Sequence, residues 1–145
     1  MRIARCTSAE AAGWLELRLA LWPAPRDEHL GEMTLMAANP QRFAAFVAYA
    51  DSAAVGLAEA AIRTDYVNGA QSSPVGFLEG LYVVPHARRK GVARALVLEV
   101  SRWADASGCE ELASDAVLAN SASHAVHRAL GFDETERVVF FRKRL

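Results

Sequence analysis

The clearest chemical signal in the sequence is a group of positive charges at the expected start of a helix. Arg88, Arg89 and Lys90 directly precede Gly91, and an apolar helical pattern follows. A helix N-terminus offers unpaired N–H groups and a positive dipole end, and glycine lets a ligand approach the backbone closely. The segment therefore favours an anion site, for which phosphate is the usual ligand. A solvated basic turn is the alternative, because such short patterns often arise by chance.

Two carboxylates lie within or directly after apolar segments of the chain. Glu79 interrupts the apolar run "VGFLEGLYVV", and burying it unpaired would be costly. It could face solvent in an ion pair, or it could be a functional carboxylate, which the break in the apolar pattern only hints at. Asp115 follows the short apolar segment "EELAS", where an aspartate is also common in a turn or helix cap.

The second half of the chain supplies the elements that would position these groups. Val75–Val84 reads as a central strand, in which glycines such as Gly80 suggest a bulge or a close approach of another backbone. The pattern then predicts a helix over Lys90–Ala106 that ends before Gly108, a short strand Glu110–Ser114, a helix from Asn120 or Ser121 to Leu130 that ends at Gly131, and a terminal strand Arg137–Leu145.

The first half predicts an antiparallel arrangement. A hairpin is expected from Arg42–Ala50 and Ala53–Arg63 around Asp51-Ser52, followed by a turn-rich loop, Thr64–Pro74. The remaining predicted elements are a first strand in Met1–Cys6, a helix over Ala9–Trp22 capped by Ser8, and a helix over Glu28–Asn39 capped by Asp27. The order βααβββαβαβ indicates an α/β fold.

The composition limits the class of protein. The chain has 145 residues, 52% of them hydrophobic, so we expect one domain over residues 1–145 with a core of its own. A net charge of −1 gives no basic field for nucleic acid. Cys6 and Cys109 form no disulfide or zinc pattern, and the histidines have no metal-ligand spacing. Without a secretory segment or a long apolar run, we expect a cytoplasmic protein.

Two blocks carry a resemblance to a known superfamily. The segment "RRKGVA" is similar to the R/Q-x-x-G-x-G/A pyrophosphate loop of the GCN5-related N-acetyltransferase (GNAT) superfamily, with Arg88, Gly91 and Ala93 at the defined positions. The later block "NSASHAVHRALGF" resembles the motif in which an asparagine opens a helix and a Gly-Phe pair closes it. The resemblance implies a GNAT fold, with a mixed central sheet flanked by helices, and acetyl-CoA as cosubstrate.

Further segments resemble one branch, the short single-domain aminoglycoside 6'-N-acetyltransferases. They are "LWP", "DYVNG", "SSPV", "FLEG", "ASD" and "GFDETERVVFFRKR". This resemblance implies acetylation of the 6'-amine of an aminoglycoside, an antibiotic-resistance activity, and a homodimer. Two alternatives stay open: an N-acetyltransferase for another small polyamine or a peptide amine, and a non-catalytic acyl-CoA-binding module.

The resemblance also implies roles for cosubstrate-binding residues. The pyrophosphate would bind backbone N–H groups of the loop from Arg88 to Ala93, which comprises Arg88, Arg89, Lys90, Gly91, Val92 and Ala93. Leu81 and Val83 would pair through their backbones with the pantetheine arm, although their side chains could equally be strand core. Asn120 would hydrogen-bond the cosubstrate, or would only cap its helix.

For the substrate side, the resemblance implies Glu79, Asp115 and Glu136 as ligands of the cationic substrate, with Glu79 and Asp115 also handling its proton. Trp22 and Tyr66 would be aromatic walls for the sugar rings. Alternatives are a core position for Trp22 and a solvated charge for Glu136. Many members of the superfamily have a tyrosine as general acid where this chain has His127. The histidine could protonate the leaving thiolate or could be a packing residue.

Overall fold

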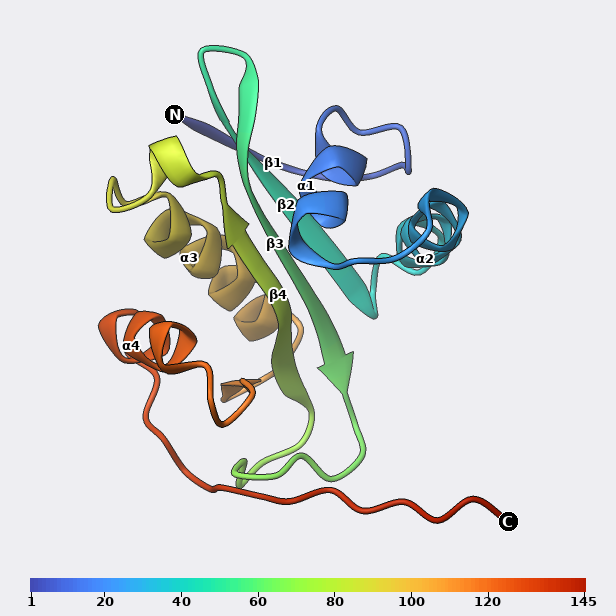
Figure 1. Ribbon diagram of the computed structural model, residues 1–145, viewed down its shortest axis with the longest axis vertical. Coiled ribbons are helices and arrows are strands. Elements are labelled where there is room, and N and C mark those ends of the chain that lie inside the picture. The colour runs from blue at the N-terminus through green and yellow to red at the C-terminus, as the bar shows by residue number, and fades with distance from the viewer.

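The apolar segments at the centre of the chain form a sheet that is covered on both faces. The computed structural model describes residues 1–145 (Figure 1). Its five strands are β1 (Arg2–Arg5), β2 (Phe43–Ala50), β3 (Ala53–Arg63), β4 (Val75–Val83) and β5 (Leu112–Ser114). They lie in the order β1-β2-β3-β4-β5, and only the β4–β5 pair is parallel. This mixed sheet is the predicted one.

Helices form a layer on each face of the sheet. They are α1 (Trp14–Leu21), α2 (Arg26–Ala38), α3 (Val92–Ala106) and α4 (Ser121–Ala129), with a short 3-10 turn, η1 (Pro85–Ala87). In β2, Phe46 and Ala48 belong to the core under α3, whereas Val47 and Tyr49 belong to the core under α1 and α2. Since successive strand residues face opposite sides, a sheet buried on both faces requires the continuous apolar sequence of β2.

The predicted hairpin is confirmed. Asp51 and Ser52 have φ angles of 48° and 70°, the left-handed values of a tight hairpin turn. Every helix expected from the sequence is present, and all but the first differ from their predicted bounds only slightly. α3 begins at Val92 rather than Lys90, and Pro25 rather than Asp27 precedes the first residue of α2.

The first helix is shorter than its apolar pattern predicted. It begins at Trp14, because Gly13 adopts a left-handed conformation, with φ 82°, and interrupts the expected helix. A Cβ on Gly13 would lie 2.2 Å from the Cβ of Ala54, so the chain passes very close to β3 here. The Ser8 hydroxyl accepts the Glu10 N–H at 3.1 Å in a preceding turn and caps no helix.

The predicted terminal strand, Arg137–Leu145, is wrong for the single chain. Residues 133–145 lie outside every helix and strand; in Figure 1 the segment passes below the β3–β4 loop, and its C-terminal end extends away from the body of the molecule. Phe140 and Phe141 are 82% and 92% exposed, because no strand of the same chain lies beside this segment. None of the helices has the length and apolarity that a membrane span requires.

Candidate active site

The two neighbouring strands β4 and β5 part after three residue pairs, and this leaves one edge of β4 open. The last pair is Leu78 with Ser114, whereas β4 continues to Val83. The Val84 N–H donates to the Val55 carbonyl on β3 at 2.9 Å. Because the backbone direction alternates along a strand, Val83 and Leu81 present their N–H and C=O groups to the open edge. These are the two residues expected to pair with pantetheine.

A β-bulge lies where the strands part. The β3–β4 register moves from Ala60↔Leu78 to Glu59↔Gly80, so Glu79 is an extra residue in β4. A bulge turns side chains away from their regular direction and leaves the strand bent. The bulge that the glycine in this strand indicated is therefore present beside the predicted catalytic carboxylate.

Glu79 has a counter-ion. Its carboxylate accepts a hydrogen bond from the Arg63 guanidinium at 2.8 Å, and both side chains are 36% exposed. The Arg63 guanidinium carbon also lies 3.6 Å from the centroid of the Phe77 ring. Glu79 is thus the solvent-facing, paired carboxylate that the first alternative described. A cationic substrate would meet this carboxylate with Arg63 already beside it.

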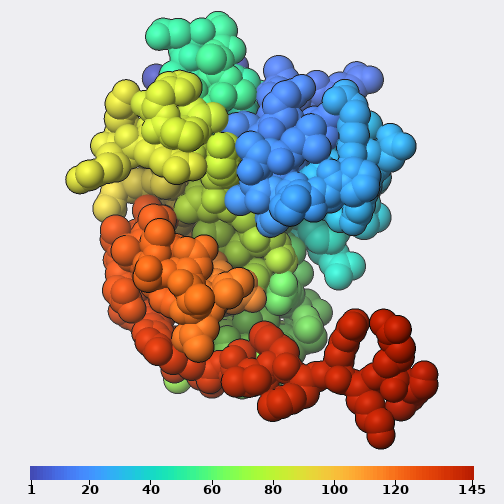
Figure 2. Space-filling model, viewed as in Figure 1, coloured from blue at the N-terminus to red at the C-terminus, as the bar shows by residue number.

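Glu79 borders a cleft between the sheet and the first two helices. The cleft has a volume of about 510 Å³, and its lining includes Trp22 after α1, Glu28 and Glu32 from α2, and Leu35. Figure 2 shows β4 exposed at the surface between the segments that contain α1 and α4. An acidic cleft with an aromatic wall suits a cation.

Trp22 packs against the bulge. A Cβ added to Gly80 would lie 2.4 Å from Cζ2 and Cη2 of the indole, so only glycine fits beneath the ring. Trp22 is half-buried, and its main-chain N–H donates to the Arg18 carbonyl at 2.8 Å as the helix ends. The residue is therefore in part a packing residue and in part the wall of the cleft.

The basic loop has the form that an anion site requires. Gly91 has φ 84° and precedes the first residue of α3, and no side chain caps this helix end. Arg88, Arg89 and Lys90 are exposed beside it. The Arg88 side chain donates to the Val83 carbonyl at 2.7 Å, so it occupies one acceptor on the open edge of β4. The Arg88 N–H donates to the Pro85 carbonyl at 3.3 Å as the short 3-10 turn ends.

The other cosubstrate candidates have structural contacts as well. The Val92 side chain is buried in the core under α3, and Ala93 is half-buried. The Asn120 side chain accepts the Ser123 N–H at 3.1 Å, which is the helix-cap role. These contacts involve side chains, and they leave the backbone N–H groups of residues 92 and 93 in the first turn of α3.

His127 lies at the junction of α4 and the end of β5. Its Nε2 is 2.8 Å from the Ser114 hydroxyl, and its Nδ1 is 2.7 Å from the Ser123 carbonyl. Since a carbonyl only accepts, Nδ1 carries the proton in neutral His127 and Nε2 accepts from Ser114. α4 has no buried residue of its own, so this contact and the packing of Phe132 against the ring hold it in place.

The remaining substrate candidates come from three exposed segments. Asp115 directly follows the last residue of β5, and it makes no ion pair. Tyr66 is 77% exposed on the β3–β4 loop. Glu136 is exposed on the C-terminal segment, where its neighbour Thr135 packs against Gly69 of the same loop. The structure thus brings Glu136 beside the Tyr66 loop, whereas Asp115 follows Ser114, the last residue of β5 that pairs with β4.

The Tyr66 loop is tied to the edge of the sheet by a carboxylate. Glu111 accepts hydrogen bonds from the Ser72 hydroxyl and from the Gln71 N–H, the latter at 2.8 Å. These bonds hold the pKa of Glu111 below its usual range. The loop is therefore fixed at one end while Tyr66 faces solvent.

Several residues of the site were missed by reasoning from the sequence. Arg63 and Ser114 contact predicted residues, and nothing in their local pattern marked them. Glu59 could have been found, because it interrupts the apolar strand "AAVGLAEAAIR" as Glu79 interrupts its own strand. Glu59 is only 3% exposed and bonds Arg18, another charged residue on an apolar face.

No group of three or more histidine, cysteine or acidic side chains could hold a metal ion.

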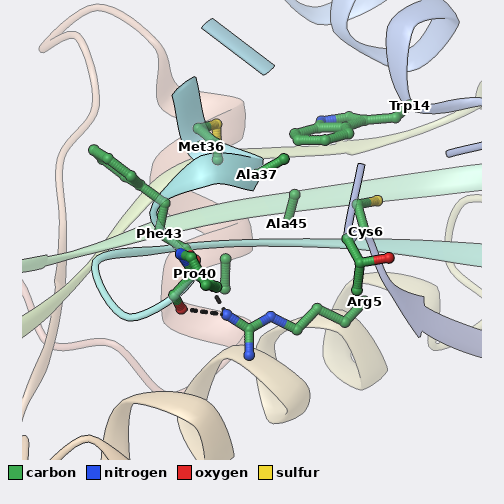
Figure 3. A pocket seen from close by; sticks show the side chains of 10 residues that line it. Arg5, Cys6, Trp14, Met36, Ala37, Pro40, Phe43 and Ala45 are labelled. Atoms are coloured by element: carbon green, nitrogen blue, oxygen red, sulfur yellow. Dashed lines mark hydrogen bonds between the residues drawn. The ribbon is translucent and has the colours of Figure 1, made fainter. Parts of the chain in front are cut away.

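A second cavity, of about 220 Å³, lies between the first two strands and α2 (Figure 3). Arg5 closes one side of it by donating to the carbonyls of Pro40 and Phe43, and most of its lining is apolar. None of the predicted site residues lines this cavity.

Comparisons with known proteins match this geometry. The Acetyltransferase (GNAT) family matches residues 11–132. An aminoglycoside N(6')-acetyltransferase type 1 from Acinetobacter baumannii is 48% identical over 146 residues, which cover 100% of this chain and 99% of that protein. A protein of the same name from Salmonella enteritidis is 50% identical over 147 residues, with 99% of both chains covered.

Solved structures give the same result. The aminoglycoside 6'-N-acetyltransferase from Acinetobacter haemolyticus superposes with a TM-score of 0.95 at 48% identity, covering 100% of this chain and 99% of that one. A related 6'-N-acetyltransferase, in complex with the bisubstrate analogue CoA-S-monomethyl-acetylneamine, has a TM-score of 0.94 at 47% identity, covering 99% and 98%. The fold, the family match and the extent of identity together show that the chain belongs to the acetyltransferase (GNAT) family.

Proposed function

We propose that this protein is an aminoglycoside 6'-N-acetyltransferase, which transfers acetyl from acetyl-CoA directly to the 6'-amine of an aminoglycoside antibiotic. The observation that carries this proposal is the identity of 48% and 50%, over essentially the whole chain, to enzymes of that name. The aligned region includes the β3–β4 loop and most or all of the C-terminal segment as well as the cosubstrate loop. We take residues 1–145 to form one acetyltransferase domain.

The open edge of β4 and the basic loop fit acetyl-CoA. Leu81 and Val83 offer backbone groups on the side where β5 has ended, as a pantetheine amide requires. The uncapped start of α3, with Arg88, Arg89 and Lys90 around it, suits a pyrophosphate. Occupation of the edge would require Arg88 to release the Val83 carbonyl, and its guanidinium would then be free to bind phosphate oxygens.

Bound acetyl-CoA supplies the acetyl thioester, and we assign the remaining chemistry to side chains and backbone of this chain. The N–H of Leu81, on the open edge, would polarise the carbonyl. Glu79 and Asp115 would hold the 6'-ammonium and accept its proton, directly or through water. His127 would donate to the departing sulfur from Nε2 once that nitrogen is protonated and no longer accepts from Ser114, because its Nδ1–H is bonded to the Ser123 carbonyl. Both cysteines are buried, which argues against an acyl-enzyme.

We assign substrate recognition to the acidic and aromatic groups around the cleft. An aminoglycoside carries several ammonium groups, and Glu79, Asp115 and Glu136 would pair with them. Trp22 and Tyr66 would contact the apolar faces of its sugar rings. The exposed position of Tyr66, on a loop anchored by Glu111, supports a role in binding rather than in the core.

We also propose a homodimer in which the C-terminal segment of each chain packs on its partner. The segment has an apolar stretch, Val138–Phe141, whose side chains are exposed in the single chain. An exposed apolar strand sequence is a template for pairing with another chain. Dimerisation would thereby supply the strand contacts that the sequence predicted for Arg137–Leu145.

The compartment follows from the cosubstrate. A reaction that consumes acetyl-CoA has to take place where the cell keeps it, so we propose that the enzyme acts in the cytoplasm. Separate assays of the cytoplasmic and periplasmic fractions of expressing cells would test this. Activity confined to the periplasmic fraction would contradict it.

The proposed activity is tested by measuring CoA release with kanamycin and, in parallel, with an analogue that carries a 6'-hydroxyl in place of the amine. We expect turnover with kanamycin and little with the analogue, because only the amine is the nucleophile. Binding of acetyl-CoA without turnover of any aminoglycoside would overturn the substrate assignment. Spermine and peptide amines, tested in the same assay, would then identify the other N-acetyltransferase activities that the sequence left open.

A further inference from the structure

A buried group of charged and polar side chains lies beneath Trp22, and the proposed chemistry does not use it. Arg18, His29 and Glu59 are 3%, 1% and 3% exposed. They come from α1, α2 and β3, so the group ties both helices of this face to the sheet. We call these three residues the Arg18 cluster.

The Arg18 guanidinium uses its donors in three directions. Its Nη1 donates to both carboxylate oxygens of Glu59 at 2.6 Å, its Nη2 donates to Glu32, and its Nε donates to Nδ1 of His29 at 3.1 Å. The Trp14 indole N–H also donates to Glu59, at 2.7 Å. Burying an ion pair removes both charges from water, so such a pair contributes little net stability. What the cluster does contribute is fixed geometry.

His29 fixes the main chain of Trp22. A guanidinium only donates hydrogen bonds, so Nδ1 of His29 is the acceptor and the ring proton is on Nε2. This Nε2–H donates to the Trp22 carbonyl at 3.0 Å. His29 therefore joins Arg18, at the centre of the cluster, to the residue at which α1 ends.

The same cluster reaches the indole of Trp22 and the bulge. The Arg18 guanidinium carbon lies 5.0 Å from the ring centroid, within the range of a cation–π contact. The outer atoms of the ring lie on Gly80, whose register partner on β3 is Glu59. These contacts are continuous: Glu59 bonds Arg18, and Arg18 lies over Trp22. Trp22 packs on Gly80, which pairs with Glu59 in the sheet.

We propose that Arg18, Glu59 and His29 are positioning residues that hold Trp22 against the Gly80 bulge and thereby set the width of the substrate cleft. This inference rests on the proposed function. The two groups on either side of Gly80 are the Glu79 carboxylate and the Leu81 N–H, so a displaced indole would change the space in front of both. All three residues line the base of this cleft, but they are at most 3% exposed, so we assign their effect to the position of Trp22 rather than to contact with the substrate.

The first test replaces His29 with leucine, which has a similar size and makes neither hydrogen bond. We expect the KM for kanamycin to rise at least about tenfold while kcat changes less than about threefold, because the binding wall moves and the reacting groups stay. The dissociation constant for acetyl-CoA should stay within about twofold, since the Arg88–Ala93 loop is untouched. A purely structural role for His29 would lower the melting temperature without this split between KM and kcat.

A second variant removes the ion pair without leaving a lone buried charge. Arg18→Met combined with Glu59→Gln keeps an oxygen for the Trp14 N–H and should raise the same KM in the same direction. Arg102→Met is the matched control, because it breaks the exposed ion pair with Glu99 on α3 and should leave all constants unchanged. Wild-type KM values in the folded cluster variants would overturn the proposal.

A double-mutant cycle separates this proposal from the proposed function. Gly80→Ala should lower the melting temperature and weaken acetyl-CoA binding, because the new methyl group collides with a fixed indole. When Gly80→Ala is combined with either cluster variant, it should lower the melting temperature and the acetyl-CoA affinity by less, because Trp22 can then move away from the methyl group. Strictly additive effects would overturn the proposal. Neither readout needs an aminoglycoside, so a wild type without aminoglycoside turnover would refute the proposed function alone.

Discussion

At the scale of single residues, the Glu79 carboxylate has one cation beside it and a cleft in front of it. The Arg63 guanidinium is 2.8 Å away, and it also lies over Phe77, so it is held on the sheet side of the carboxylate. An incoming ammonium group would share the carboxylate with Arg63 or displace it. This arrangement keeps the carboxylate paired before the substrate binds.

Replacing Glu79 with glutamine should lower kcat/KM for kanamycin by about 100-fold, because an amide of the same shape accepts no proton from the amine. The acetyl-CoA dissociation constant should stay within about twofold. Steady-state kinetics and a binding titration measure the two quantities. Glu99→Gln, at a half-buried position on α3 outside the candidate site, is the control. An unchanged kcat/KM in the Glu79 variant would remove this residue from the mechanism.

The two thiols should be unreactive in the folded protein. Burial raises the pKa of Cys6 to about 12, with the Glu59 carboxylate adding to the effect, and burial also raises the pKa of Cys109. At pH 8 about one Cys6 side chain in ten thousand would be a thiolate. We expect no reaction with a disulfide reagent until denaturant is added, and then two thiols per chain. One fast-reacting thiol in the native state would contradict this.

The raised pKa of Cys6 also determines how the free energy of unfolding changes with pH in the alkaline range. The folded chain keeps the Cys6 proton between pH 9 and 12, where the unfolded chain releases it. Folding then binds a proton, so the free energy of unfolding falls as the pH rises through this range. A Cys6→Ala variant should lose this part of the alkaline slope in denaturant titrations at several pH values.

Residue types that break a local pattern were the part of the site that could be predicted from sequence. Glu79 and the basic loop before Gly91 were selected in this way as candidates, and their roles stay predictions; Glu79, Leu81 and Asp115 all lie near the point where β4 and β5 part. Contacts between distant segments carry no such signal. The pairing of Arg63 with Glu79 depends on strand register, which the sequence alone does not specify.

At the scale of secondary-structure elements, the start of α3 depends on the backbone of Gly91. Its φ of 84° is unfavourable for any residue with a Cβ, although a Cβ there would meet no atom within 4 Å. Gly91→Ala should therefore destabilise the fold by about 1 kcal/mol through backbone strain alone. The melting temperature should fall by roughly 2–4 °C, and acetyl-CoA binding should weaken as the loop changes shape.

Gly31 provides the matched control for this prediction. It lies inside α2, has an ordinary helical backbone and also has open space around it. Gly31→Ala should therefore stabilise the protein by about 0.5–1 kcal/mol. Thermal unfolding of the two variants should shift in opposite directions. A rise in melting temperature for Gly91→Ala would contradict the strain argument.

Most elements could be predicted because their periodicity reflects what they bury. The hairpin of β2 and β3, the loop after it and the helices α2, α3 and α4 all lie close to their predicted bounds. The family resemblance and the mixed sheet are confirmed. The early part of α1 could not be predicted, because the close approach of Gly13 to Ala54 is a tertiary contact that overrides an apolar helical pattern.

At the scale of the whole molecule, the C-terminal segment is the part whose apolar side chains a single chain leaves exposed to solvent. The β-branched and aromatic run Val138–Phe141 within Arg137–Leu145 is typical of a strand, but its side chains are exposed here. An apolar strand pattern predicts that its side chains will be buried, but it does not specify whether the same chain or a partner chain buries them. This is the physical reason why the strand prediction failed for the isolated chain.

The proposed homodimer predicts how this segment responds to charge. Replacing Phe140 and Phe141 together with glutamate should convert a dimer into a monomer, because both side chains would be buried against the partner. Light scattering coupled to size-exclusion chromatography measures the mass. Glu99→Gln should leave the dimer intact. A wild type that is monomeric at micromolar concentration would refute the dimer.

The brief pairing of β4 with β5 has a consequence for how the protein opens. Only three register pairs join β5 to the sheet, and α4 beyond it buries no residue. Residues 110–132 should therefore behave as a separate cooperative unit whose opening costs less than global unfolding. Their amide protons should exchange with deuterated solvent well before those of β2 and β3. A molecule bound in the gap between β4 and β5 would slow that exchange, and amide exchange would then report occupancy of the gap without any turnover.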